Sequence, residues 1–358
     1  MNKNYYAVIM AGGVGTRFWP LSTQKLPKQF HDMLGTGSTL IQQTFNRFEN
    51  LIPSENILIA TNKKYEDLVQ QQLPKVTSKQ LLLEPAMRNT APCILYSAFK
   101  IYNENPDGIM IIAPSDHWID DEVTFLQNIQ TSFNFCAEND ALMTLGIKPS
   151  SPNTGYGYIQ HDTSKSDIKK VLNFTEKPNL ETAIQFLEEG NYLWNAGIFI
   201  WSVKSILKAF KTHLPTMYTL FSKGEKSYNT ASENTFIEDN YACSENISID
   251  FGIMEKAAGV FVLPVEFGWN DLGTWGSLYQ KLEKDNHQNA TVGGQVIYRD
   301  ANNNIVRTQS GKRVVIQGLK DYIVVEKDDV LLICPKSGEQ EIKQITSDVK
   351  TKFGDEFV

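Results

Sequence analysis

The sequence predicts an α/β fold, in which a Rossmann-like mixed, mostly parallel sheet is flanked by helices, followed by a small β module. Two observations carry this prediction. Up to about residue 150, short apolar runs alternate with segments of helical period, which is typical of a parallel sheet. After residue 285, short strand-like runs follow one another at spacings of about 8 to 10 residues. We expect one domain at 1–285, with halves at 1–150 and 151–285, and a second domain at 286–358.

Composition and charge narrow the class of protein. The chain has 358 residues, of which 41% are hydrophobic and 21% charged, as is ordinary for a globular enzyme. Its net charge is -7, from 34 basic and 41 acidic residues. An acidic chain of this kind is not expected to bind nucleic acid, so any basic patch must be local.

The cysteines and the N-terminal residues bear on location. Cys93, Cys136, Cys243 and Cys334 lie far apart, which favours reduced thiols over a disulfide scaffold or a zinc site. The first residues lack the form of a signal peptide, and no later run reaches a membrane-spanning length. We therefore expect a cytoplasmic protein that does not associate with membranes.

The first half follows a regular order. The run at 7–10 is apolar without alternation, as in a parallel strand buried on both faces. Ligands of such sheets bind at the carboxyl ends of the strands, where residues 12–15, Glu84 and Asp116 follow their runs. Further strands are expected at 57–60, 81–83, 109–113 and 141–145, and helices at 38–48, 65–73, 90–102 and 125–133.

Residues 150–280 are expected to form polar and aromatic loops, including NTGYGYI, FTEKP, YLWNAGIFIW and FGWNDLGTW. Aromatic rings can stack on the C–H faces of a sugar, while amides and carboxylates bind its hydroxyls. Helices are expected at 180–189 and 203–210, with one more ending at 253–256.

The remaining residues predict an all-β module with a terminal helix at 339–352. Strands are expected at 295–299, 304–308, 313–317, 322–326 and 330–334. Their exposed edges would need a cover or a partner.

The glycine loop (residues 11–17) follows the first strand. Its glycines allow positive φ, and its successive N–H groups form a concavity suited to a phosphate. Arg17 and Lys28 add positive charge nearby. The loop alone is ambiguous, because Phe18 replaces the third glycine of a dinucleotide fingerprint and the ending of a P-loop is missing. A purely structural turn therefore remains open.

The longer string GGVGTRFWPLS…PKQF removes much of this ambiguity. It resembles the signature of the sugar-1-phosphate nucleotidylyltransferases, and Phe18-Trp19 and Lys28-Gln29-Phe30 resemble the mannose-1-phosphate guanylyltransferase branch. Seven further segments resemble the same family in order, and together they cover about residues 5–280. They are EPAMRNTAP (84–92), APSDH (113–117), NTGYGYI (153–159), FTEKP (174–178), WNAGIF (194–199), DFGIMEK (250–256) and GWNDLGTW (268–275).

The resemblance implies transfer of GMP from GTP to α-D-mannose 1-phosphate, with Mg²⁺, to give GDP-mannose and pyrophosphate. In-line attack on the α-phosphorus requires mainly positioning and charge neutralisation. The same reaction with another sugar 1-phosphate or nucleotide is an alternative. So is a non-catalytic sugar-nucleotide-binding regulatory subunit, although Arg17, Lys28, Asp116 and Asp271 together argue against it. A dehydrogenase is a distant third, because the fingerprint glycine is missing.

For the nucleotide, the resemblance implies that Arg17 holds the β- and γ-phosphates and that Lys28 bridges to the sugar phosphate. The alternative is a solvated surface pair. A carboxylate such as Glu84 would accept hydrogen bonds from guanine, whereas Asn89 and Thr90 could serve only as helix caps. The expected catalytic residues are Arg17, Lys28 and Asp116, and the expected nucleotide-binding residues are Ala11, Gly12, Gly13, Gly15, Thr16, Arg17, Lys28, Glu84, Arg88, Asn89, Thr90 and Ser115.

The resemblance also implies that Asp116 and Asp271 are the ligands of Mg²⁺, which prefers oxygen. Asp116 could instead be a cap or turn acid, and Asp271 an Asx-turn residue. We do not expect His117 to bind metal, because no second histidine lies at ligand spacing.

The sugar phosphate is expected to meet residues of the second half. Lys177 would bind the phosphate and Glu176 the hydroxyls, although Glu-Lys-Pro is often only an exposed turn. Asp250 could contact the sugar or simply cap a helix. The expected set is Gly157, Glu176, Lys177, Asn195 and Asp250.

The tail bears on further activities. Larger members of the family carry a phosphomannose isomerase domain with metal-binding histidines, but no histidine follows Asn289 here. We therefore expect no isomerase activity. The tail resembles the short, left-handed β-helix-like module of the smaller enzymes, which can pack on the catalytic domain or on a second subunit of a homodimer.

Overall fold

The computed structural model describes residues 1–358, which form two compact units built from interleaved segments. The large unit comprises Met1–Gly12, Thr44–Ser115 and Ile119–Trp269. The small unit comprises Gly13–Gln43, Asp116–Trp118 and Asn270–Val358. The glycine loop therefore leaves the large unit at Gly12 and continues in the small one.

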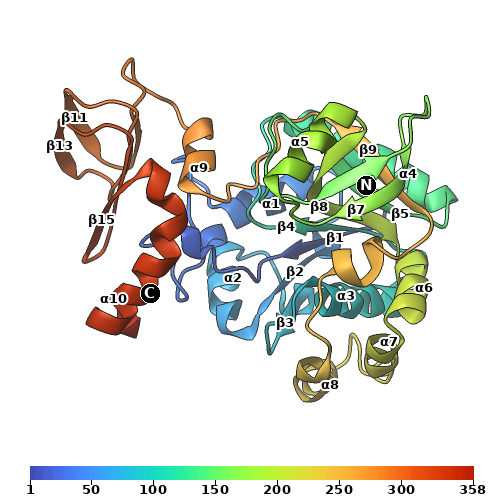
Figure 1. The fold of residues 1–358 in the computed structure, drawn as a ribbon. Coiled ribbons are helices and arrows are strands. Elements are labelled where there is room, and N and C mark those ends of the chain that lie inside the picture. The colour runs from blue at the N-terminus through green and yellow to red at the C-terminus, as the bar shows by residue number, and fades with distance from the viewer. The chain divides into compact units, whose positions relative to one another are not determined.

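A nine-stranded mixed sheet forms the large unit, in the order β3-β2-β1-β4-β8-β5-β9-β7-β6 (Figure 1). Pairing is parallel from β3 to β4, whereas β8 runs antiparallel to both β4 and β5. The predicted α/β fold with a mixed sheet is thus confirmed, and parallel pairing is concentrated in the first half. The strands are β1 Tyr5–Met10, β2 Ile57–Asn62, β3 Leu81–Glu84, β4 Ile109–Pro114, β5 Leu142–Ile147, β6 Tyr158–His161, β7 Lys169–Thr175, β8 Tyr192–Ser202 and β9 Val260–Val265.

Strand β1 shows why its sequence is apolar without alternation. Tyr6 and Val8 pack in one core with helices α3 (Thr90–Glu104) and α6 (Val203–His213). On the other face, the ring of Tyr5 stacks on Phe133 of α4 (Glu122–Glu138), with ring centroids 4.2 Å apart. A strand covered on both faces needs apolar side chains at every position.

The predicted helices are present, and several begin at the polar residues that cap them. Asn89, Asp121, Asn179 and Ser202 each accept a hydrogen bond from a backbone N–H of the first turn. None of the helices has both the length and the apolar character needed to cross a lipid bilayer. The other helices of the first 270 residues are α1 Leu40–Glu49, α2 Glu66–Gln72, α5 Leu180–Glu189, α7 Pro215–Ser222 and α8 Glu233–Asn240, with a π-helical turn η7 at Asp250–Met254.

The expectation of polar and aromatic loops between 150 and 280 was wrong in part. Strands β6 to β9 occupy this region, and the WNAGIF segment lies inside the eleven-residue strand β8. Aromatic and β-branched residues suit a pleated surface that is covered on both sides. Gly197, with a φ of 67°, interrupts the regular pattern within the strand. The sequence of this strand therefore has no clear alternation.

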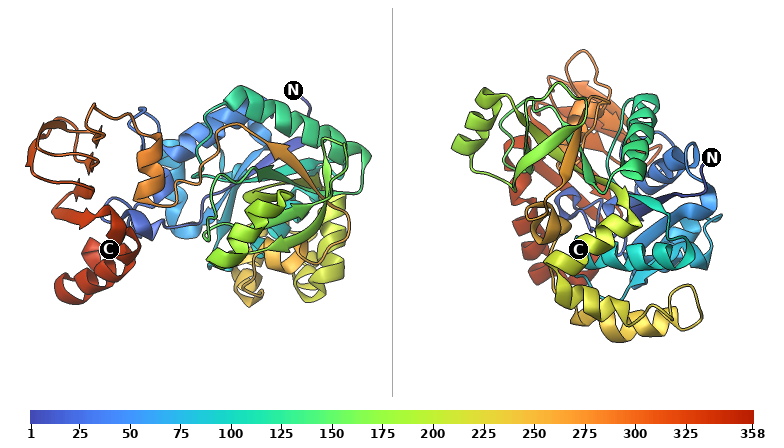
Figure 2. Two further views of the ribbon diagram at one scale, coloured as in Figure 1. Left: turned by 45° about the horizontal axis from the view of Figure 1, so that its top comes forward. Right: turned by 90° about the vertical axis from the view of Figure 1, so that its right-hand side faces the viewer.

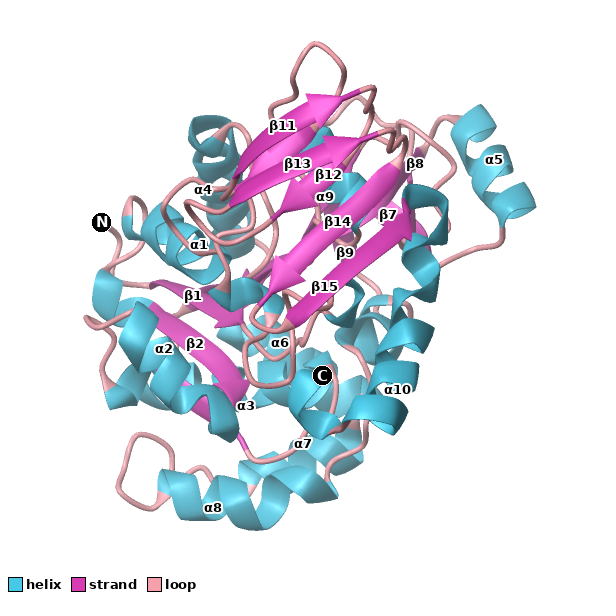
Figure 3. Cartoon of the chain, turned by 90° about the vertical axis from the view of Figure 1, so that its left-hand side faces the viewer, coloured by secondary structure: helices cyan, strands magenta, loops and turns pink.

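The small unit contains a β-helix-like module. Strands β10, β12 and β14 form one parallel stack, β15 adds to it in antiparallel fashion, and β11 pairs with β13 in parallel (Figure 3). The five predicted strands are confirmed, and three-residue β10 was missed. The bounds are β10 Ala290–Val292, β11 Gln295–Arg299, β12 Ile305–Arg307, β13 Arg313–Gln317, β14 Tyr322–Lys327, β15 Val330–Pro335, α9 Trp275–Lys281 and the terminal helix α10 Ile342–Phe353, drawn red in Figure 2.

Residues from both ends of the chain share the core of the small unit. Phe18 and Trp19 are buried in one cluster with strand residues such as Ile305 and Ile323. The indole Nε1 of Trp19 also donates to the carbonyl of Phe357, at 2.7 Å. The segment after the glycine loop is therefore packed on the β module.

A buried ion pair in the large unit gives a test of stability. Lys100 Nζ lies 2.7 Å from both carboxylate oxygens of Glu233, and both side chains are 7% exposed. Glu233→Ala would leave an unpaired buried ammonium, so we expect a loss of about 3–5 kcal/mol in the free energy of unfolding by urea. Glu238→Ala, which breaks the exposed pair with Lys63, should leave the free energy of unfolding unchanged. Equal losses in the two variants would contradict the prediction.

Candidate functional site

Lys28 is the centre of the site residues in the small unit. It lies in the short helical turn η2 (Lys28–Phe30), and its side chain is only 4% exposed. Its Nζ donates to Asp116 Oδ2 at 2.9 Å and to the carbonyl oxygen of Asp271 at 2.7 Å. The structure thus brings together three residues that the sequence separates widely.

Asp116 is held as an anion. Burial opposes ionisation, but the positive charges of Lys28 and His117 outweigh it, so the pKa of Asp116 lies below its usual value. Asp116 lies in a turn, as one alternative expected, but it does not cap a helix, because the cap of α4 is Asp121, which accepts from Thr124 N at 3.0 Å. Asp116 is therefore an ionised carboxylate paired with a lysine.

Asp271 combines two features. Its carbonyl oxygen accepts from Lys28, while its Oδ1 accepts from Gly273 N at 3.0 Å, as in an Asx turn. The alternative that Asp271 is an Asx-turn residue therefore describes its local conformation. The turn places its backbone beside the same ammonium that Asp116 binds.

Asp116 and Asp271 both carry a carboxylate, the type of ligand that a hard divalent cation takes, and the side chain of Asp116 and the backbone of Asp271 meet at Lys28. Mg²⁺ often takes one or two carboxylates and completes its octahedron with phosphates and water. No group of three or more His, Cys, Asp or Glu side chains is arranged to hold a metal ion. A metal at Asp116 and Asp271 would therefore depend on oxygen ligands from a bound substrate and water.

The glycine loop closes tightly on Lys28. Gly15 has a φ of 72°, and a Cβ placed on it would lie 2.5 Å from Lys28 Cβ. Only glycine permits both this conformation and this approach. Two residues further, Arg17 is exposed in η1 (Thr16–Phe18), and its guanidinium pairs with no protein group. It is a cation that an anionic ligand can reach.

In the large unit, Glu84 ends β3 beside the start of the glycine loop. Its Oε1 accepts a hydrogen bond from the hydroxyl of Tyr241, and its Oε2 lies 3.6 Å from where a Cβ on Gly12 would be. Burial raises the pKa of Glu84 to about 7, although the hydrogen bond from Tyr241 opposes the rise. Tyr241 belongs to none of the motifs, and nothing in the sequence signals its role.

The other expected nucleotide residues are engaged by the protein itself. Arg88 Nε and Nη2 donate to the carbonyl of Ala242 at 3.0 and 2.8 Å. Asn89 caps α3 by accepting from Thr90 N, and Thr90 Oγ1 accepts from Ile249 N at 2.8 Å. The capping alternative for Asn89 thus describes its contact in the structure, and a nucleotide role for these residues stays a prediction.

The ends of the neighbouring strands are tied together by their backbones. Ala11 N donates to the carbonyl of Ala60 at 2.7 Å, and Ser115 N donates to that of Met10 at 3.0 Å. Ala11 and Ser115 are therefore positioned by the parallel sheet.

The expected sugar-phosphate residues come together in the large unit. Asn195 Nδ2 donates to Asp250 Oδ1, and Asn195 N donates to the carbonyl of Gly157, both at 2.8 Å. A Cβ on Gly157 would lie 2.5 Å from Glu176 Oε2, and Lys177 pairs with the carboxylate of Glu176. The five residues therefore form one polar cluster.

Asp250 is a half-buried acid of this cluster. Burial and the negative charge of Glu176 raise its pKa to about 6. Ile249 occupies the N-cap position of η7, and the N–H of Phe251 in its first turn donates to Ser248 Oγ at 3.3 Å, so the alternative that Asp250 serves as the cap is wrong. Two neighbouring carboxylates with amide and ammonium groups can accept and donate hydrogen bonds to sugar hydroxyls.

Two family profiles match the chain. A profile described as Nucleotidyl transferase matches residues 6–288. A second, described as MannoseP isomerase/GMP-like beta-helix domain, matches residues 294–348. The second match falls on the β-helix-like strands of the small unit.

Similar proteins extend over nearly the whole chain. The alginate biosynthesis protein AlgA of Pseudomonas fluorescens is 36% identical over 348 residues, covering 95% of this chain and 71% of the relative. A protein of Salmonella montevideo named mannose-1-phosphate guanylyltransferase is 36% identical over 361 residues, covering 98% of this chain and 75% of its own.

A crystal structure from Thermus thermophilus, described as mannose-1-phosphate geranyltransferase, matches with a TM-score of 0.88 and 29% identity, covering 97% of this chain and 99% of the other. The architecture of both compact units is thus shared with a solved structure. The extent of the profile match, together with these relatives, shows that the chain belongs to the nucleotidyl transferase family.

Proposed function

We propose that the protein transfers GMP from GTP to α-D-mannose 1-phosphate, releasing pyrophosphate and forming GDP-mannose. The observation that carries the proposal is the buried ammonium of Lys28 between Asp116 and Asp271, next to the glycine loop and the exposed Arg17. Such a cluster suits a reaction between two anions. The relative named mannose-1-phosphate guanylyltransferase, 36% identical to this chain, supports the choice of base and sugar.

The small unit would neutralise the phosphates. An oxygen of the sugar phosphate attacks the α-phosphorus, the bond to the bridging oxygen of the β-phosphate breaks, and pyrophosphate leaves with that oxygen. Arg17 would hold the β- and γ-phosphates. The ammonium of Lys28 would leave Asp116 and donate to phosphate oxygens instead. Because Lys28 is positioned beforehand by Asp116 and Asp271, it would stabilise developing charge without large rearrangement.

Asp116 and Asp271 are proposed to hold Mg²⁺. When bound, the ion would neutralise phosphate oxygens as a Lewis acid. Asp116 is already ionised, and its side chain would pass from Lys28 to the cation.

The residues of the large unit would select the two substrates. Guanine presents N1–H and N2–H₂ as hydrogen-bond donors, and an ionised Glu84 can accept hydrogen bonds from both. The cluster of Asp250, Glu176 and Asn195 would bind mannose hydroxyls, with Lys177 on the phosphate.

We further propose a cytoplasmic homodimer. All four cysteines are free thiols, which suits a reducing compartment. Ile297 and Val315 lie opposite each other on β11 and β13 and are 60% and 66% exposed, which would suit a contact with a second copy. Sedimentation of the purified protein tests the dimer.

Two alternative functions can be separated by one assay. Turnover is measured as pyrophosphate release over a grid of nucleotides and sugar 1-phosphates, with GTP and mannose 1-phosphate expected to be the best pair. Preference for another pair would change the substrates. Binding of GDP-mannose without pyrophosphate release would favour a non-catalytic regulatory subunit.

Replacing Lys28 tests the phosphate site. Lys28→Ala should lower kcat by about 10²–10³-fold, because a fixed cation in the transition state is lost. The exposed Lys25, in the same loop, provides the matched control, since Lys25→Ala should leave kcat unchanged. Parent-like turnover of Lys28→Ala would remove this residue from the mechanism.

Replacing Asp116 tests the proposed metal ligands. Asp116→Asn keeps the shape of the side chain but removes its charge. The Mg²⁺ concentration that gives half-maximal turnover should therefore rise at least about tenfold. Asp107→Asn, at an exposed pair with Lys204, is the control. A magnesium titration that overlays the parent's would show that Asp116 is not a ligand.

The pKa of Glu84 gives a pH dependence. Because guanine needs an ionised acceptor, kcat/KM for GTP should rise as the pH increases through about 7, where Glu84 loses its proton. Glu84→Gln should remove this step from the profile measured between pH 6 and 9. The step persisting in Glu84→Gln would assign it to another group.

A further inference from the structure

Tyr241 lies at the start of η6 (Tyr241–Cys243), at the end of helix α8, and none of the motifs includes it. We propose that Tyr241 is a positioning residue that sets base selection by fixing the carboxylate of Glu84. This inference rests on the proposed function, in which Glu84 accepts hydrogen bonds from guanine.

The two carboxylate oxygens of Glu84 have different surroundings. Tyr241 is fully buried, and its hydroxyl donates to Glu84 Oε1. Oε2 faces Gly12, where the missing side chain leaves the approach open. One oxygen is therefore fixed by the protein, and the other points to the start of the glycine loop. A hydrogen bond to a carboxylate is among the stronger kinds in proteins, so the bond restricts rotation of the side chain.

The segment that carries Tyr241 is itself well anchored. The ring of Tyr241 meets that of Phe221 edge-on, with centroids 5.8 Å apart, and its carbonyl accepts from Ser244 Oγ at 2.6 Å. The next carbonyl, that of Ala242, accepts from Arg88 at 2.8 Å. Two consecutive residues thus hold Glu84 and Arg88, both of which the sequence assigns to the nucleotide.

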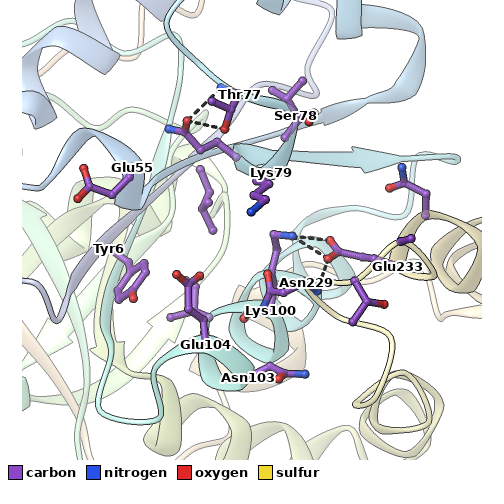
Figure 4. Close-up of a pocket in the computed structure, with 17 residues that line it drawn as sticks. Tyr6, Glu55, Thr77, Ser78, Lys79, Lys100, Asn103, Glu104, Asn229 and Glu233 are labelled. Atoms are coloured by element: carbon purple, nitrogen blue, oxygen red, sulfur yellow. Dashed lines mark hydrogen bonds and ion pairs between the residues drawn. The ribbon is translucent and has the colours of Figure 1, made fainter.

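Helix α8 is tied to α3 at its other end. Glu233, its first residue, accepts from Lys100 Nζ, and Asn229 N donates to Glu233 Oε2 at 2.6 Å (Figure 4). The hydroxyl of Tyr96 also donates to Glu233. Lys100, Asn229 and Glu233 border a cavity of about 720 Å³ near the amino ends of the strands. Because the charges of Lys100 and Glu233 satisfy each other, we assign them to holding α8 rather than to binding a ligand.

Removing the hydroxyl of Tyr241 should change the base with which Glu84 forms its preferred hydrogen bond. The hydrogen bond opposes the effect of burial, so without it the pKa of Glu84 rises above about 7. A protonated carboxyl can donate to N1 of adenine, whereas an ionised one accepts from N1–H of guanine. Besides Tyr241, the buried thiol of Cys93 from α3 faces Glu84, and no lysine, arginine or second carboxylate shifts its pKa.

The test is a comparison of bases in Tyr241→Phe, which keeps the buried ring. With mannose 1-phosphate saturating at pH 7, the ratio of kcat/KM for GTP to that for ATP should fall about tenfold, equivalent to about 1.4 kcal/mol. The pH at which kcat/KM for GTP reaches half of its maximum (the midpoint) should move upward. Tyr228→Phe removes another buried hydroxyl, which donates to the carbonyl of Phe221 at 2.8 Å, and should leave ratio and midpoint unchanged.

The outcomes separate the inference from the proposed function. Equal losses for GTP and ATP with an unmoved midpoint would overturn the positioning role and leave only a structural one. A parent protein that releases no pyrophosphate would overturn the proposed function. In that case equilibrium binding of GTP and ATP to parent and Tyr241→Phe still decides the inference, since an unchanged binding ratio would refute it. Urea unfolding of each variant checks that it is folded.

Discussion

The buried ammonium of Lys28 is the constraint on which the small unit depends. A lysine with only 4% of its side chain exposed must be paired, and an unpaired charge there would cost several kcal/mol. Its partners are Asp116 and the carbonyl of Asp271, from segments 88 and 243 residues away. Satisfying one ammonium therefore fixes three remote segments together, and Gly15 lets the glycine loop close over the same side chain.

The half-buried acids of the proposed sites share one arrangement, in which a protein donor binds one oxygen of each carboxylate. Asp116 has an oxygen engaged by Lys28, Glu84 has one engaged by Tyr241, and Asp250 has one engaged by Asn195. Each donor fixes the orientation of a carboxylate before any ligand arrives. The positive charges of Lys28 and His117 lower the pKa of Asp116. The neutral donors leave the pKa of Glu84 raised by burial, and that of Asp250 raised by burial and by the negative charge of Glu176. Preorganisation and titration behaviour thus have the same structural source.

The sequence predicted local features well and remote pairings poorly. Strand β1 and its parallel neighbours were predictable because burial on both faces demands continuous apolar runs. Strand β8 was not, since aromatic residues and Gly197 obscure its pattern. Lys28 entered as a candidate through its charge near the glycine loop, and Asp116 through its place at the end of a strand. Their roles came from the resemblance, and their contact depends on tertiary structure. Tyr241 was missed because its partner lies 157 positions away and a lone tyrosine gives no signal of its own.

The aromatic pair of the signature also acquires a physical explanation. Phe18 is fully buried, its ring lies 5.7 Å from the ammonium of Lys28 and it meets Trp275 edge-on. Trp19 packs in the same cluster and donates to the carbonyl of Phe357. These side chains fill the core that the glycine loop shares with the β module. They are needed for packing and not for contact with a nucleotide, because burial leaves them no surface for one. The β module is thus part of the scaffold that holds Lys28, and a change in its core should reach the phosphate site through Phe18.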